Sequence, residues 1–212
     1  MKRYEGRLDK VKLAEALMEI GAIQINTAEF FTWTSGIESP IYCDNRLTIS
    51  YPSVRKEICR QFAARIKELP GEVDVIAGCA TAGIPHAAWL SEELGLPMVY
   101  VRGSKKKHGK ENLIEGEITA GQRVVVIEDL ISTGGSAVQA AAALKDTGAH
   151  VKEVLSIFTY ELPQSADVFR EADLSYSSLL TYSELIDTLN LNEENKRVLE
   201  NWRSSMKEKK GK

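Results

Sequence analysis

VVVIEDLISTGGSAV, residues 124–138, reads as a strand, a small polar loop and the start of a helix. Val124 to Ile127 are apolar and β-branched, which is typical of a buried strand. From Ala137 onward, good helix formers continue until Gly148, a frequent helix stop. The loop therefore lies at the carboxyl end of a strand and at the N-terminus of a helix. Exposed N–H groups and the helix dipole make such a place an anion site.

The composition of this loop indicates which anion it binds. The glycines let the backbone come close to an oxyanion, and three hydroxyl groups add donors. The loop is neither a Walker A motif nor G-x-G-x-x-G, and it has no lysine to meet β- and γ-phosphates. A phosphate monoester is therefore the expected ligand. The loop residues are Ser132, Thr133, Gly134, Gly135 and Ser136.

Two acids, Glu128 and Asp129, stand between the strand and this loop. Carboxylates beside a phosphate would repel it, so we expect them to face another part of the same ligand, one that carries hydroxyl groups or a metal. A phosphate at one end and a diol a few ångströms away describe ribose 5-phosphate. An ordinary strand-to-helix turn is the alternative, but it gives no reason for acids next to a hydroxyl-glycine run.

Strands and helices alternate through the middle of the chain, which predicts the α/β class with an open, mostly parallel twisted sheet and helices on both faces. Ligands of such sheets bind at the carboxyl ends of the strands, near a switch in strand order. The expected strands are 73–78, 97–101, one within 117–127, and 151–159. The expected helices are 52–69, 84–94 and 136–147.

The two ends of the chain lie outside this alternation. We expect a helix at 8–20, two strands within 30–49, and a last helix at 194–203. The prediction is one domain, 1–212, with its core at about 50–160. A small hood from about 8–49 and 161–190 covers the sheet edge, and 204–212 form a disordered tail.

The composition of the chain argues against several functional classes of protein. The chain has 212 residues and a net charge of −3, which argues against a general nucleic-acid binder. Its three cysteines lack metal-ligand spacing and read as reduced thiols of a cytoplasmic protein. The N-terminus shows no secretory signal, and no apolar run approaches the ~18 residues of a membrane span. We therefore expect no nucleic-acid or membrane partner.

Four segments in fixed order resemble the orotate-specific branch of the type I phosphoribosyltransferase family. They are FTWTSGIESPIYCDNR (31–46), VIAGCATAGIPHAAW (75–89), YVRGSKKKHGKENLIEG (100–116) and IEDLISTGGSA (127–137). The resemblance implies transfer of a phosphoribosyl group from phosphoribosyl diphosphate (PRPP) to orotate, with Mg²⁺ carried mainly by PRPP and not by protein side chains alone. It also implies a homodimer whose subunits share their active sites.

The family pattern assigns roles to matching positions of this chain. Asp129, Glu128, Lys106 and His108 are the expected catalytic residues. Ser132 is expected to touch orotate, and Arg46 is offered as its second partner, although an ordinary surface arginine is the alternative. PRPP is expected to contact Arg102, Lys106, His108, Glu128, Asp129, Leu130, Ile131, Ser132, Thr133, Gly134, Gly135 and Ser136.

The basic run RGSKKKHGKEN, 102–112, reads either as a solvated charged loop or as a functional one. It follows a predicted strand at the ligand edge of an acidic chain, and its cations suit a pyrophosphate leaving group. In the family, this loop closes over the active site of the neighbouring subunit. The chain departs from other branches at Thr81 and Ala82, which replace an aromatic residue and a lysine, and at Thr34, which replaces a lysine.

Two rival functions share part of this pattern. A purine-type phosphoribosyltransferase would have the 124–138 signature, but its base-recognition segment has no counterpart here. A PRPP-sensing regulator would need a nucleic-acid-binding surface, which the acidic balance disfavours. The remaining histidines, His86 and His150, are scattered and are expected to be structural or exposed.

Overall fold

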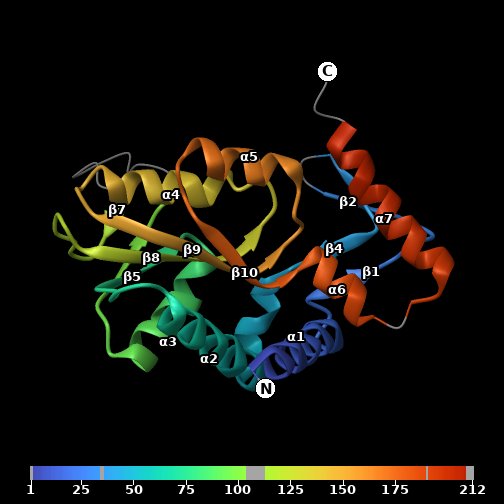
Figure 1. Cartoon of the computed structure of the whole chain (residues 1–212), viewed down its shortest axis with the longest axis horizontal. Coiled ribbons are helices and arrows are strands. Elements are labelled where there is room, and N and C mark those ends of the chain that lie inside the picture. Colours follow the sequence, from blue (N-terminus) through green and yellow to red (C-terminus); the bar gives the residue numbers. More distant parts are fainter. Residues whose placement is uncertain (1, 34–35, 104–112, 190, 209–212) are drawn as a thin grey trace.

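The computed structural model describes residues 2–33, 36–103, 113–189 and 191–208. Its centre is a six-stranded sheet in the order β10-β9-β8-β5-β6-β7, in which only β7 is antiparallel to its neighbour (Figure 1). The expected open, mostly parallel sheet is confirmed. The strands are β5 (Val75–Cys79), β6 (Met98–Val101), β7 (Ile114–Glu115), β8 (Arg123–Ile131), β9 (His150–Thr159) and β10 (Tyr176–Thr181).

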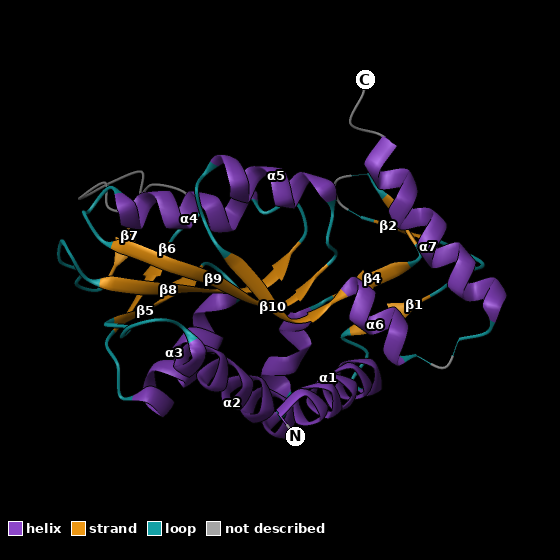
Figure 2. Ribbon diagram, in the orientation of Figure 1, coloured by secondary structure: helices purple, strands orange, loops and turns teal. Residues whose placement is uncertain are grey.

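Helices cover both faces of the sheet, as Figure 2 shows. One face packs on α1 (Lys2–Glu19), α2 (Pro52–Glu68) and α3 (Gly83–Leu94), and the other on α4 (Gly135–Lys145) and α5 (Pro163–Glu171). Successive strand residues point to opposite faces, so the strands must be apolar throughout. Val125 and Ile127 belong to the first core, whereas Val124 and Val126 belong to the second.

The order of the strands creates a crevice beside β8. The chain leaves β5 through α3 toward β6, and it leaves β8 through α4 toward β9, on the opposite side. Because α3 and α4 cover opposite faces, the carboxyl ends of β5 and β8 diverge where the strand order switches. The loop that we predict to bind an anion, residues 132–136, lies at this point, between β8 and α4.

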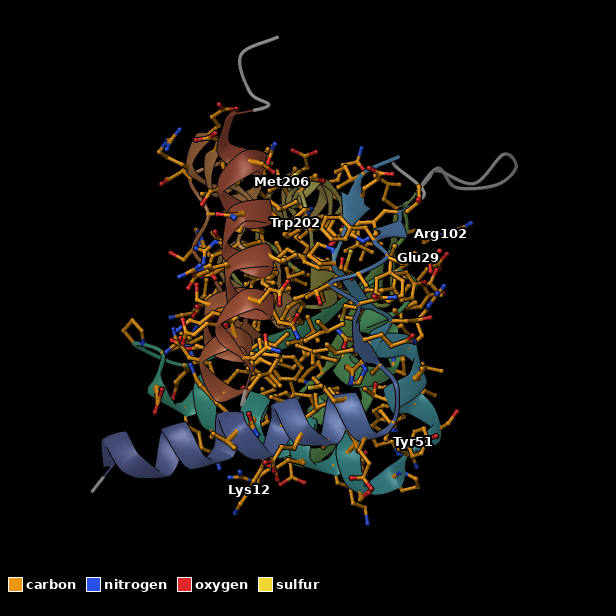
Figure 3. The ribbon with its side chains drawn as sticks, turned by 90° about the vertical axis from the view of Figure 1, so that its right-hand side faces the viewer. Lys12, Glu29, Tyr51, Arg102, Trp202 and Met206 are labelled. Atoms are coloured by element: carbon orange, nitrogen blue, oxygen red, sulfur yellow. The ribbon has the colours of Figure 1, made fainter. Side chains whose placement is uncertain are left out.

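The hood is built from both ends of the chain and lies to the right in Figure 1. Strand β1 (Ile23–Ile25) pairs with β4 (Ile41–Cys43), and β2 (Phe31–Thr32) pairs with β3 (Glu38–Ser39). Helices α6 (Tyr182–Thr188) and α7 (Glu193–Glu208) complete it, and α7 carries Trp202 and Met206 (Figure 3).

Aromatic contacts hold the hood to the core. The ring of Trp33 lies 4.4 Å from that of Tyr160 and 5.9 Å from that of Trp202. The indole N–H of Trp202 donates to the carbonyl of Glu38 at 2.6 Å, so both ends of the chain meet in one cluster. Within the described residues, no helix is both long and apolar enough to span a bilayer.

Three boundaries in the structure differ from the predicted ones. Part of 161–190 lies on the sheet, because α5 covers one face of it and β10 pairs with β9, burying Leu179 and Leu180. The tail predicted at 204–212 is helical through Glu208, since Met206 continues the buried stripe of α7. The strand predicted to end at Ile127 runs to Ile131. It carries both acids within its last residues.

Gly83 is required by the close packing of α3 on β8. A Cβ atom there would lie 2.3 Å from the carbonyl oxygen of Ile127. We predict that Gly83→Ala lowers the free energy of unfolding by about 1–3 kcal/mol, as overpacking does. Chemical denaturation measures it. The control is Gly103→Ala, because a Cβ at Gly103 would meet nothing within 4 Å. Equal unfolding midpoints for the two variants would contradict the prediction.

Candidate active site

A cleft of about 380 Å³ opens at the carboxyl ends of β5 and β8. Three segments that are distant in sequence form its walls: the end of β4 with the turn after it, the loop after β5, and the end of β8 with the start of α4. The lining residues are Cys43, Asp44, Arg46, Ala80, Thr81, Ala82, Glu128, Asp129, Leu130 and Ser136. The structure thus brings together the two acids, Ser136 and Arg46.

Glu128 points inward. It is only 5% exposed, and its carboxylate accepts the backbone N–H of Asp129 at 2.9 Å and the hydroxyl of Ser136 at 3.2 Å. Burial, and then the neighbouring Asp129, raise the pKa of Glu128 above its usual range. Through Ser136, Glu128 holds the first turn of α4 against the end of β8.

Asp129 has a different environment. It is partly exposed and lines the cleft. Its side chain hydrogen-bonds with that of Glu128, and its backbone carbonyl accepts the side-chain amide of Asn45 at 2.7 Å. Because Asp129 is the more exposed acid of the pair, it is the one that hydroxyl groups of a ligand can reach.

The loop between β8 and α4 presents backbone donors. No side chain caps α4, so the N–H groups of its first turn remain for an anion. The two glycines of the loop have different surroundings. Gly134 has φ +84°, and a Cβ there would meet the Phe169 ring at 2.8 Å, so this glycine also allows packing on α5. A Cβ at Gly135 would meet none of the described residues within 4 Å. The approach of both glycines to a ligand stays a prediction.

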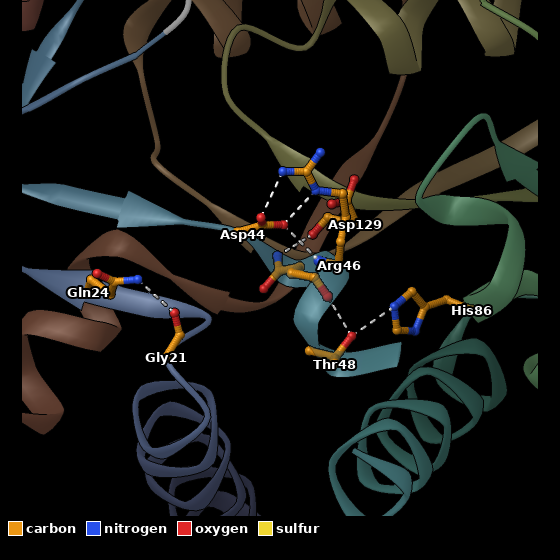
Figure 4. A network of polar contacts seen from close by, with 8 residues as sticks. Gly21, Gln24, Asp44, Arg46, Thr48, His86 and Asp129 are labelled. Carbon is orange, nitrogen blue, oxygen red and sulfur yellow. Dashed lines mark hydrogen bonds and ion pairs between the residues drawn. The ribbon is translucent and has the colours of Figure 1, made fainter. Parts of the chain in front are cut away.

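Arg46 lies at the rim of the cleft but is not a free cation. Its guanidinium binds both carboxylate oxygens of Asp44, at 2.6 and 2.7 Å (Figure 4). This pairing holds the pKa of Asp44 below its usual range. An orotate carboxylate would have to share Arg46 with Asp44.

The basic loop is described only at its start. Arg102 follows β6, and its guanidinium lies 3.4 Å from the carboxylate of Glu115 on β7. Lys106 and His108 lie outside the described residues, as does Thr34. Within the described ranges, no group of three or more His, Cys, Asp or Glu side chains is arranged to hold a metal ion.

Sequence reasoning missed a polar network under the cleft, which can be followed in Figure 4. Asn45 is fully buried, and its backbone carbonyl accepts the hydroxyl of Thr48 at 2.5 Å. The same hydroxyl lies 3.2 Å from Nε2 of His86, which is 3% exposed. His86 is thus structural, one of the two expected alternatives. No local motif signals the bond between Asn45 and Asp129, because 84 positions separate them.

Comparison with known proteins agrees with this geometry. The phosphoribosyl transferase domain family matches residues 52–184. An orotate phosphoribosyltransferase of Oceanobacillus iheyensis is 55% identical over 199 residues, covering 92% of this chain and 98% of that protein. The chain belongs to the orotate phosphoribosyltransferase family.

Solved structures of family members share this architecture. UMP synthase of Leishmania donovani aligns with a TM-score of 0.78 and 26% identity, covering 92% of this chain but 42% of that longer one. An orotate phosphoribosyltransferase of Mycobacterium tuberculosis, solved in complex with PRPP, aligns with a TM-score of 0.65 and 27% identity over 84% of this chain and 98% of that one.

The burial of His86 predicts a pH dependence of stability. Burial lowers its pKa from 6.5 to about 4. Between these values the unfolded chain binds more protons than the folded one, so stability is lost as pH falls from 6.5 toward 4. We predict that His86→Gln removes this part of the loss in unfolding free energy at low pH, which is a few kcal/mol at most. Denaturant unfolding at several pH values measures it.

The control for this measurement is His150→Gln, because His150 is exposed. It should keep the wild-type slope of stability against pH. A His86→Gln slope that matches the wild-type slope would contradict the assignment.

Proposed function

We propose that the chain transfers the 5-phosphoribosyl group of PRPP to orotate, giving orotidine 5′-monophosphate and pyrophosphate in de novo pyrimidine biosynthesis. The proposal rests on one observation: the cleft has hydrogen-bond donors in one place and a carboxylate in another. Uncapped backbone donors at the start of α4 suit the 5-phosphate, and the partly exposed carboxylate of Asp129 suits the ribose hydroxyls. The names of the relatives support orotate as the acceptor.

The reaction breaks the bond from the anomeric carbon to pyrophosphate and forms a bond from that carbon to a ring nitrogen of orotate, which loses its proton. As in other glycosyl transfers, the sugar gains oxocarbenium character. The α4 loop anchors the phosphate and fixes the position of the ribose. Asp129 binds the hydroxyls, and its negative charge favours the cationic sugar. Glu128 keeps the loop in place through Ser136.

The oxygen-rich side of the cleft also fits Mg²⁺, which prefers carboxylate, hydroxyl and phosphate oxygens. Asp129 is the residue that would face an ion carried by PRPP, because it is the more exposed of the two acids that line the cleft. When bound, Mg²⁺ neutralises charge on pyrophosphate. We assign Arg102, Lys106 and His108 to the same leaving group on the strength of the family pattern.

We further propose that the protein acts in the cytoplasm as a homodimer. All three cysteines are free thiols, which fits a reducing compartment. The cleft is open. Among its described lining residues the cation is Arg46, which already forms an ion pair with Asp44. Further positive charge for pyrophosphate must therefore come from the 102–112 loop, which in the family reaches across a two-fold axis.

A spectrophotometric assay tests the proposed reaction. Orotate absorbance should fall when PRPP and Mg²⁺ are both present, and pyrophosphate should appear in equal amount. Adenine and hypoxanthine serve as alternative acceptors. Consumption of a purine without consumption of orotate would replace this function with that of a purine phosphoribosyltransferase.

We predict that Asp129→Asn keeps the fold but loses about 10²–10³ in kcat, as comparable electrostatic deletions do. The amide keeps the shape of the side chain but removes the negative charge beside the sugar. Steady-state kinetics measure the loss, and circular dichroism checks the fold. Asp146→Asn, on the exposed end of α4, is the matched control and should retain full activity. Near-normal turnover of a folded Asp129→Asn variant would remove Asp129 from this role.

The shared-site dimer is tested by mixing two inactive variants, Lys106→Ala and Asp129→Asn. If the loop acts on the partner, each hybrid dimer has one site with both defects and one with neither. Random exchange of equal amounts makes half of the dimers hybrids, so activity should return. If the loop serves its own subunit, every site keeps one defect. No recovery, with exchange verified by mass spectrometry, would exclude the shared site.

A further inference from the structure

The carbonyl of Asp129 lies where the sheet no longer supports strand β8 on one side. Pairing of β5 with β8 ends at Gly78 and Ile127, but β8 continues to Ile131 and stays paired with β9 alone. A buried backbone carbonyl without a partner is costly. The side-chain amide of Asn45 takes the place of the missing strand and donates to this carbonyl at 2.7 Å.

Asn45 is itself fixed in position. It is the first residue of the 3-10 helix η1 (Asn45–Ser50), and none of its surface is exposed. The hydroxyl of Thr48 donates to its backbone carbonyl at 2.5 Å and lies 3.2 Å from Nε2 of His86. Because His86 is carried by α3, the backbone from which the Asn45 amide extends is held from the core as well as from the hood.

Among the described residues, only one of the two polar atoms of the Asn45 side-chain amide has a hydrogen-bond partner. The side-chain oxygen of Asn45 is buried and, among the described residues, has no hydrogen-bond partner. A buried polar atom without a partner costs about 1–3 kcal/mol. Among the described residues, the side-chain amide of Asn45 makes one hydrogen bond, and that bond goes to Asp129, which lines the cleft.

We propose that Asn45 is a positioning residue for the phosphoribosyl transfer. By holding the carbonyl of Asp129, it fixes the backbone from which the Asp129 carboxylate extends toward the ribose hydroxyls and the developing positive charge. This inference rests on the proposed function and adds a residue to it. The competing explanation is that Asn45 serves only to dock the hood on the core.

The test compares Asn45→Ala with Thr48→Val. Asn45→Ala removes the donor to Asp129 and should lower kcat about 10–100-fold, since small misplacements of a reacting group have such effects. The KM for PRPP should change far less, because the phosphate anchor on α4 is intact. Thr48→Val breaks the bonds from η1 to His86 without touching the amide. It should lower the melting temperature at least as much as Asn45→Ala does, with kcat within about twofold of wild type.

Docking alone predicts another pattern. Both variants would then lose kcat in proportion to their loss of stability, and this result would overturn the proposal. Wild-type protein that fails to consume orotate with PRPP would instead overturn the proposed function. Active wild type together with an Asn45→Ala variant of unchanged kcat would remove only the role of Asn45.

A second variant covers the case in which Asn45→Ala does not fold. Asn45→Asp is nearly isosteric, and its carboxyl group can donate to the Asp129 carbonyl only while protonated. Asp44 adjoins it in the chain and Asp129 accepts the bond from its side chain, and the negative charges of these two acids favour the protonated form. The ratio of variant to wild-type kcat should therefore fall as pH rises. A ratio that is constant with pH, or failure of both variants to fold, would overturn the proposal.

Discussion

The active site depends on one mismatch in the sheet, namely that β8 is longer than the neighbour β5 with which it pairs. Past Ile127 the strand has a partner on one side only. The free side leaves room for the cleft, and it leaves a carbonyl that something else must satisfy. An amide from the hood satisfies it. The same protruding end carries Glu128 and Asp129 and leads directly into the first turn of α4, so one strand sets the spacing of the whole cleft.

Two adjacent acids acquire different environments because they differ in burial. Glu128 is almost fully buried, accepts two hydrogen bonds and has a raised pKa. Asp129 is partly exposed in the cleft, and its side chain hydrogen-bonds with that of Glu128. The buried acid holds the loop through Ser136, and the exposed one is left at the surface of the cleft.

The sequence predicted the sheet because strands buried on both faces are apolar along their length. It failed at β10, an edge strand whose YSSLLT sequence is half polar, and at the end of β8, where acids look like a loop. The location of the site could be predicted, since strand, glycine and helix signals are local. The Asn45 contact and the Arg46–Asp44 pair could not, because they depend on how the hood folds back onto the core.

The hood joins β1 to β4 from the first part of the chain with α6 and α7 from the last. A ribosome delivers these parts at very different times, since domains form as the chain emerges. The strands of the sheet leave the exit tunnel before Trp202 does. The hydrogen bond from the Trp202 indole to the carbonyl of Glu38 therefore forms late. A newly made chain therefore passes through a stage in which the strands of the sheet have emerged and the hood is incomplete. During that stage, Trp33 and Tyr160 lack their contacts with Trp202.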